Sequence, residues 1–105
     1  MSGIGRGTTP INTFKTSIDL TNANVIYVTY SQLEQTVIEK TIEDIVSINE
    51  TSLSVKLTQK ETLRLKSEYP VKIQIRAGFG GDSGDRVRSN IMVTTVEPIL
   101  KGGVI

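Results

Sequence analysis

Apolar and polar residues alternate along much of the chain, and this alternation predicts β-strands. In Ser52–Leu57 and Val71–Phe79 every second residue is apolar. A period of two with one apolar face is typical of a sheet that packs one side onto a core. Five further segments, rich in β-branched and aromatic residues, are also predicted to be strands: 11–17, 24–31, 35–42, 45–48 and 86–96.

Two of these strands carry a prediction about their faces. Residues 24–31 have β-branched and aromatic side chains in both phases, as expected for a strand covered on both sides. In 86–96, the side chains of Val87, Ile91 and Val93 are predicted to share one side.

One short helical turn is predicted near residues 59–66. Thr58 and Glu61 form a T-x-x-E capping box, and Pro70 ends the segment. A short helix suits a chain that passes from one sheet to another. Together these elements predict an all-β fold, a two-layer antiparallel β-sandwich, with a small barrel as the alternative that alternation does not exclude.

A length of 105 residues predicts a single domain with two distinctive ends. Residues 1–9 hold three glycines and one aliphatic side chain that could enter a core, so we expect a flexible arm followed by a domain over 10–105. The last eight residues, PILKGGVI, form an aliphatic tail that we expect either this domain or a partner to cover. The candidate partner-binding residues are Ile4, Arg6, Ile99, Leu100, Val104 and Ile105.

Composition and charge argue against several classes of function. Without histidine or cysteine, the chain has no imidazole base, no thiolate nucleophile and none of the usual zinc ligands. We therefore expect no enzymatic activity, no metal and no cofactor. A net charge of +1 argues against nucleic acid or an anionic membrane as a partner. No apolar run approaches the ~20 residues of a membrane helix, and residues 1–10 lack the apolar stretch of a secretory signal.

The glycine-rich segment Gly78–Asp85 contains two motifs that fail their chemical requirements. Its GDSG sequence surrounds the nucleophile of chymotrypsin-like proteases, but such a serine needs a general base, and the chain has no histidine. A phosphate loop would be followed by a helix, whereas a strand pattern follows here. Asp82 and Asp85 alone fall short of a calcium site. We interpret the segment as a hairpin connection, with contact to a partner or ion left open.

Two clusters of like charge remain. The acidic residues Glu39, Glu43 and Asp44 are interpreted as solvated surface or edge protection. Four basic residues are predicted to gather on the outer faces of the last two strands, as a polar sheet face or a polar contact with a neighbouring subunit: Lys72, Arg76, Arg86 and Arg88.

Several segments, taken in order, resemble a family of small proteins from phages and prophages of Firmicutes, encoded in virion structural modules near tail or baseplate genes. The segments are Arg6–Pro10, Val37–Thr41, Leu57–Leu63, Val71–Arg76, Ile99–Leu100 and Gly103–Ile105. The resemblance implies an immunoglobulin-like domain that is made in the host cytoplasm and built into the virion. It supplies no enzymatic residues. The Met1–Gly5 leader and the Gly78–Asp85 loop depart from the family pattern.

From this resemblance we expect a virion structural protein that assembles with itself or with other virion proteins, as a tail or baseplate accessory. A head-decoration or connector protein is the first alternative. A host-surface or carbohydrate-binding module acting through Gly78–Asp85 is the second, although the chain has only five aromatic residues for sugar stacking.

Overall fold

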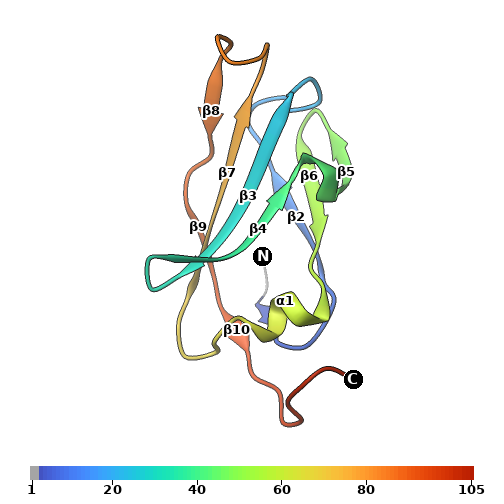
Figure 1. The fold of residues 1–105 in the computed structure, drawn as a ribbon, viewed down its shortest axis with the longest axis vertical. Helices are drawn as coiled ribbons and strands as arrows, with labels where there is room; N and C mark the ends of the chain where they lie inside the picture. Colours follow the sequence, from blue (N-terminus) through green and yellow to red (C-terminus); the bar gives the residue numbers. More distant parts are fainter. Residues whose placement is uncertain (1–2) are drawn as a thin grey trace.

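The computed structural model describes residues 3–105, which form two facing β-sheets (Figure 1). The first sheet has the order β4 (Gln35–Thr41), β3 (Val25–Gln32), β7 (Val71–Gly78) and β8 (Arg86–Arg88), and β9 (Met92–Thr94) also pairs with β7. The second has the order β2 (Ile11–Lys15), β6 (Ser52–Lys56) and β5 (Ile45–Asn49). Strand pairs within both sheets are antiparallel.

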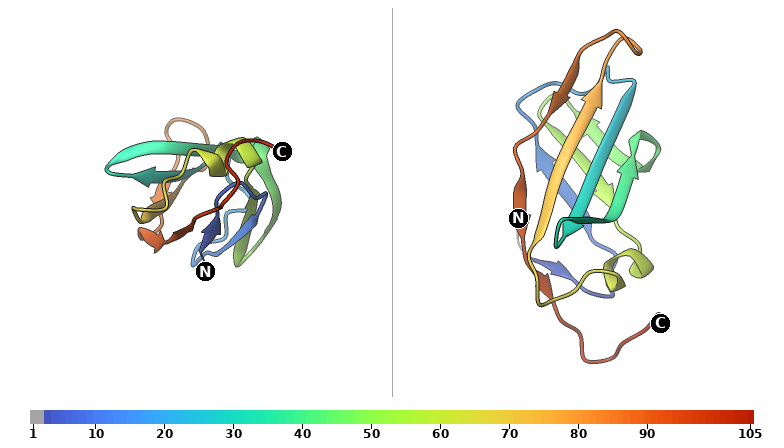
Figure 2. Two further views of the ribbon diagram at one scale, coloured as in Figure 1. Left: turned by 90° about the horizontal axis from the view of Figure 1, so that it is seen from below. Right: turned by 60° about the vertical axis from the view of Figure 1, so that its left-hand side comes forward.

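Three short elements complete the sandwich. A 3-10 turn, η1 (Ile42–Asp44), joins β4 to β5, and a helix, α1 (Gln59–Leu63), joins β6 to β7. Near one end, β1 (Ile4–Gly5) pairs in parallel with β10 (Val96–Glu97). Viewed along its length, the molecule shows the two sheets as separate layers (Figure 2).

The order of the strands is that of an immunoglobulin-like sandwich. In such domains strands B, E and D lie in one sheet and C, F and G in the other, with C′ added beside C in the variable type. Here β2, β6 and β5 take the places of B, E and D, and β4, β3, β7 and β8 take those of C′, C, F and G. The predicted antiparallel sandwich is therefore confirmed.

The core follows from the alternation that predicted the strands. Every second residue of β3 and β7 faces the second sheet, and the register places Val28 opposite Ile75 and Tyr30 opposite Ile73. The Tyr30 ring meets Phe14 of β2 edge to face, with ring centroids 6.4 Å apart. Its hydroxyl donates a 2.7 Å hydrogen bond to Asn12 Oδ1, so the two sheets share a satisfied polar contact.

The prediction that β3 is covered on both faces is wrong. Ile26, Val28 and Tyr30 are buried, but Tyr27, which points the opposite way, is 40% exposed. β-branched and aromatic residues favour strands on either face, so their presence in both phases did not report burial.

Helix α1 confirms the predicted capping box. Glu61 N donates to Thr58 Oγ1 at 3.2 Å, and Thr58 N donates to Glu61 Oε1 at 2.8 Å, so two main-chain donors of the first turn are satisfied. The helix ends at Leu63 rather than near residue 66. Leu65 is fully buried just beyond it.

The structure differs from the expected flexible arm over residues 1–9, of which Met1 and Ser2 lie outside the described residues. Ile4 is 1% exposed, and the β1 main chain bonds to the segment that contains β10, from Ile4 N to Thr95 O and from Arg6 N to Glu97 O. One aliphatic side chain suffices because the amides of Ile4 and Arg6 both find main-chain acceptors. Residues 4–6 therefore belong to the sandwich.

The single strand predicted over 86–96 is instead divided into β8, β9 and β10. Between the pairs Arg76–Arg88 and Lys72–Val93, β7 advances by four residues and the opposite segment by five. The extra residue reverses the side-chain phase. Val87 therefore packs against the core, while Ile91 and Val93 are 56% and 63% exposed, so the prediction that these three share a side is wrong.

Candidate assembly surfaces

The C-terminal segment projects beyond the end of the sandwich (Figure 1). After β10 the chain has no further strand or helix, and Leu100, Val104 and Ile105 are 108%, 56% and 92% exposed. One side chain holds its far end, because Ile105 N donates to Gln59 Oε1 at 2.6 Å and Gln59 Nε2 donates to Ile105 O at 3.2 Å. The segment thus returns to α1 with the side chains of Leu100, Val104 and Ile105 turned to solvent.

The other predicted contact residues are used inside the domain. Arg6 lies beside the C-terminal end of α1, where main-chain carbonyls lack helical partners. Its Nε donates to Leu65 O at 2.9 Å, and a terminal guanidinium nitrogen donates to Leu63 O at 3.0 Å. Ile4 is buried, and Arg6 is half-buried with its donors turned to these two carbonyls.

Ile99 belongs to the same internal junction. It is half-buried, and a Cβ added at Gly7, whose φ is +78°, would come within 2.9 Å of Ile99 Cδ1. Gly7 N also donates to Thr62 Oγ1 at 3.0 Å. The six predicted partner-binding residues therefore divide into a junction (Ile4, Arg6, Ile99) and an exposed set (Leu100, Val104, Ile105).

Helix α1 also carries a partly buried ion pair. Lys40 of β4 points inward at 7% exposure, and its Nζ lies 2.6 Å from Glu61 Oε1. Burial raises the pKa of Glu61, but the hydrogen bonds from Lys40 and Thr58 outweigh it and hold that pKa below its usual range. For Tyr30, burial and the nearby Glu61 charge both raise the pKa well above its ordinary value. The side chains of Lys40, Glu61 and Tyr30 all bond to other residues of the domain, so they contribute to its stability.

The glycine-rich loop is closed by its own arginine. Arg86 donates from one terminal nitrogen to Gly81 O at 2.6 Å and from the other to Asp85 O at 3.0 Å. At Gly84, any Cβ would overlap Phe79 O, so the turn requires glycine there. The loop gathers carbonyl oxygens around a cation instead of presenting N–H groups to an anion, which agrees with a hairpin connection between the antiparallel strands β7 and β8.

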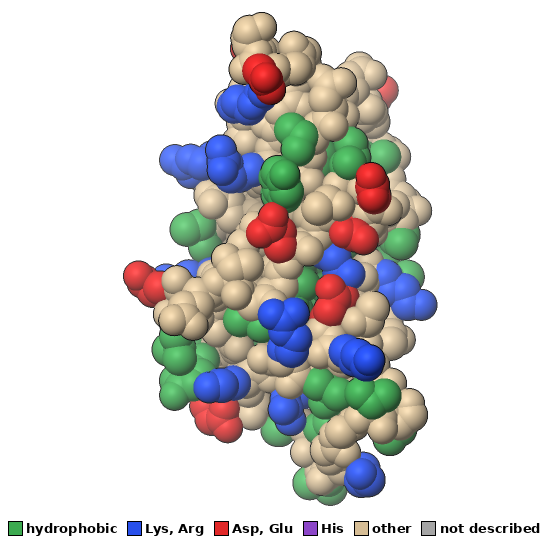
Figure 3. All heavy atoms as spheres, viewed as in Figure 1, with side chains coloured by type: hydrophobic (Ala, Val, Ile, Leu, Met, Phe, Trp, Pro, Cys, Tyr) green, Lys and Arg blue, Asp and Glu red, His purple; other side chains and the backbone are tan. Residues whose placement is uncertain are grey.

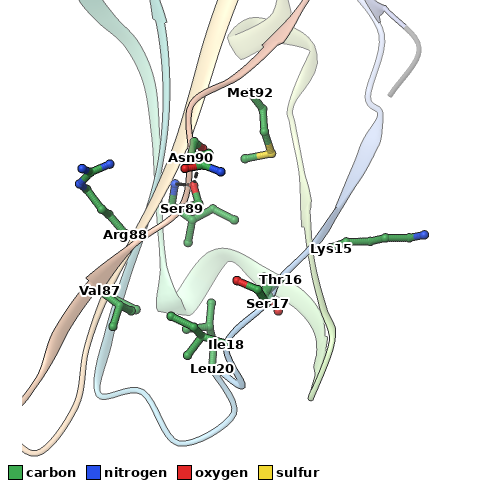
Figure 4. A pocket seen from close by; sticks show the side chains of 12 residues that line it. Lys15, Thr16, Ser17, Ile18, Leu20, Val87, Arg88, Ser89, Asn90 and Met92 are labelled. Atoms are coloured by element: carbon green, nitrogen blue, oxygen red, sulfur yellow. Dashed lines mark hydrogen bonds between the residues drawn. The ribbon is translucent and has the colours of Figure 1, made fainter.

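A groove that the sequence did not predict opens between β2 and the β8–β9 edge (Figure 4). Its volume is about 350 Å³, and its floor is apolar, with Leu20, Ile75 and Ala77 among the lining residues. Thr16 Oγ1 is buried there without a hydrogen-bond partner. The groove is lined by residues from two segments, 15–20 and 87–92, that are far apart in the sequence. No sequence motif links these segments, so the groove could be found only in the folded structure.

The charged clusters lie on the outer face of the first sheet. Figure 3 shows acidic side chains gathered over β4 and η1, and basic ones over β8 at the opposite edge. Glu39 and Glu43 are exposed, while Asp44 accepts a 2.8 Å bond from Thr41 N. Within residues 3–105, no group of three or more acidic residues is arranged to hold a metal ion.

Among known proteins, similarity to this chain is found only in comparisons of structure. No family model matches the chain, and no curated protein matches it. A strand-swapped dimer of the immunoglobulin-like domain of mouse leukocyte-associated immunoglobulin-like receptor 1 is 16% identical with a TM-score of 0.47, over 90% of this chain and 85% of that chain. The V domain of amphioxus IgVJ-C2 is 10% identical with a TM-score of 0.38, over 90% and 97%. The immunoglobulin-like class rests on the strand order described above.

Among the described residues, no helix has the length and apolar character needed to cross a membrane.

Proposed function

We propose that this chain is a non-enzymatic immunoglobulin-like structural protein of a phage virion, a tail or baseplate accessory that assembles with itself and with other virion proteins. The observation that carries the proposal is the projecting segment after β10, with three aliphatic side chains in solvent. The resemblance to small Firmicutes phage proteins supports the virion as its location.

Burial of this segment against a partner supplies a driving force for assembly. Removing a Leu, Val or Ile side chain from water contributes roughly 1.5–3 kcal/mol. Ordering the chain and docking two bodies offset part of that gain. Since Gln59 already holds the far end near α1, less conformational freedom is lost on docking than for a free tail.

The proposal is tested in particles of the phage or prophage that encodes the chain. Mass spectrometry of purified virions should detect the protein. The variant Leu100→Ser/Val104→Ser/Ile105→Ser should fold normally, as judged by circular dichroism, and be depleted from particles. A matched control changes three exposed aliphatic side chains elsewhere, Ile11→Ser/Leu33→Ser/Ile48→Ser, and should incorporate as the wild type does.

Each outcome bears on a different part of the proposal. Absence of the chain from purified particles would refute the virion role. Normal incorporation of the tail variant would refute the tail as the contact. Cross-linking within particles then separates a tail or baseplate position from a head-decoration or connector position, because the cross-linked neighbour differs.

A further inference from the structure

The outer face of the first sheet is sorted by charge from one edge to the other. We call Lys72, Arg76 and Arg88 the basic edge, and Glu39, Glu43 and Asp44 the acidic edge. Strand pairing places Thr41, Tyr27, Arg76 and Arg88 in one row across the sheet, and Glu39 follows in the next outward row with Thr29 and Gln74. Because η1 begins directly after Thr41, Glu43 and Asp44 lie close to the height of Arg76 and Arg88 along the strands, whereas Lys72 lies two outward rows away, opposite Ser31.

The basic edge is held at an electrostatic cost. Arg76 and Arg88 lie directly opposite each other, and the neighbouring hydrogen bonds, from Phe79 N to Asp85 O and from Ser89 N to Ile75 O, make theirs a non-hydrogen-bonded pair. Side chains approach most closely at such pairs, and like charges there are destabilising. Across the described residues the ion pair formed is Lys40–Glu61, which leaves both arginines without a carboxylate.

Exposed apolar side chains lie among these charges. Tyr27, between the two edges, is 40% exposed, and Ile91 and Val93 beside the basic edge are 56% and 63% exposed. Ile42 of η1, at the acidic edge, is 39% exposed. Tyrosine, arginine and aliphatic residues together are typical of a protein interface.

We propose that this face binds a second copy of the chain, face to face, about a twofold axis that runs along the strands between β3 and β7. Such a rotation lays the basic edge of each copy over the acidic edge of the other, twice per dimer, and brings Tyr27 near the axis. Closed twofold dimers are the commonest homo-oligomers, and their interface is one self-complementary patch. This inference deepens the proposed assembly function by naming the self-contact, which does not involve the tail.

Charge exchange tests the contact directly. The variants Arg76→Glu/Arg88→Glu and Glu39→Lys/Glu43→Lys each give the two edges the same net sign, although Lys72 or Asp44 keeps its own charge. Each should raise the dimer dissociation constant by roughly 100-fold or more, as measured by sedimentation velocity. An equimolar mixture should restore a dimer, because the acidic face of one variant then meets the basic face of the other. High salt should weaken the wild-type dimer.

The matched control for Arg76→Glu/Arg88→Glu is Lys15→Glu/Lys56→Glu. It makes the same change in net charge on exposed residues of the second sheet and should dimerise as the wild type does. A monomeric wild type at the highest concentration reached would overturn the proposal. So would a mixture that stays monomeric, or a control that also dissociates. A monomeric wild type whose Arg76→Glu/Arg88→Glu variant is lost from particles would assign the face to another virion protein.

The test is separable from that of the proposed function. Purified protein dimerises or not regardless of whether the chain is found in virions. The tail variant Leu100→Ser/Val104→Ser/Ile105→Ser should leave the dimer intact.

Discussion

The first and last segments of the chain have similar compositions, yet the sandwich uses them in opposite ways. Both combine glycines and one basic residue with aliphatic side chains, one in residues 1–9 and four in residues 98–105. At the N-terminal side Ile4 is buried, and its main chain bonds to the segment around β10. At the C-terminal side Leu100 and Ile105 are exposed, and Gln59 alone bonds to the main chain of Ile105.

The difference shows what admits an aliphatic residue to this core. Ile4 enters because its own amide and that of Arg6 reach the acceptors Thr95 O and Glu97 O. A buried segment must satisfy its main-chain groups, and the projecting segment has no strand edge beside it to do so. Helix α1 contacts both segments, since Arg6 bonds to its last residue and Gln59, its first, bonds to Ile105. Substitutions in the two segments and in α1 test how much each of these contacts contributes to stability.

The largest effect is expected for Ile4→Ala. Truncating a buried isoleucine costs about 2–5 kcal/mol of unfolding free energy, since it leaves a cavity that neighbours fill only in part. Leu100→Ala, at an exposed position, should change it by less than about 0.5 kcal/mol. Urea unfolding followed by circular dichroism measures both, and equal values would contradict the contrast between the two ends.

Arg6→Met should come next, at about 1–2 kcal/mol. It removes two charge-assisted hydrogen bonds and leaves the carbonyls of Leu63 and Leu65 without this donor. Arg64→Met, at an exposed arginine beside the same helix end, is the control and should fall within about 0.5 kcal/mol of the wild type. If both variants lose equal stability in urea, the effect belongs to net charge and not to the carbonyl contacts.

A pH-dependent effect is expected for Glu61→Gln, in the helix that both ends contact. The folded-state pKa of Glu61 is depressed, so its ionised form contributes stability above the unfolded value of about 4.3 that is lost as pH falls through the folded pKa. The wild type should therefore exceed the variant in stability at pH 7, with a difference that narrows below about pH 5.

Urea titrations at several pH values measure this difference. Glu68→Gln, at an exposed glutamate, is the control substitution. A wild-type advantage over Glu61→Gln that stays constant from pH 7 to the acid limit of folding would show that the Lys40–Glu61 pair is not the source of the stability.

The smallest effect on stability is expected for Gln59→Ala. Its two bonds to Ile105 are exposed, so global unfolding should change by less than about 0.5 kcal/mol. The segment 99–105 should nevertheless lose its attachment, and its amides should exchange with deuterium faster by mass spectrometry. Unchanged exchange would mean that other contacts hold the segment to α1.

Much of the sandwich could be predicted from the sequence because local rules and burial agree there. Alternation gave the extents of β6 and β7 to within a residue or so, and the Thr58–Glu61 pair located α1. The small barrel, the alternative fold, was excluded only by the strand order of the structure, because alternation does not show which strands are neighbours.

The missed features depend on contacts between distant segments. A two-residue strand such as β1 has no periodicity of its own and exists through β10. The extra residue after Arg88 changes the face on which the side chains of Ile91 and Val93 lie. Residues 88–93 contain no glycine or proline that would have indicated this irregularity. For the same reason, the sequence predicted one set of six contact residues where the structure shows a buried junction and an exposed tail.

The pairing of β1 with β10 also orders events during folding. Ile4 of β1 pairs with Val96 of β10, so the contact closes a loop that contains all the other strands of the sandwich. Such non-local contacts form late and slow the folding of β-proteins, because the entropy of closure must be overcome before the contact stabilises anything. The Ile4 side chain therefore stays unburied until the segment that contains Val96 folds, and β1 and β10 are expected to dock together late in folding.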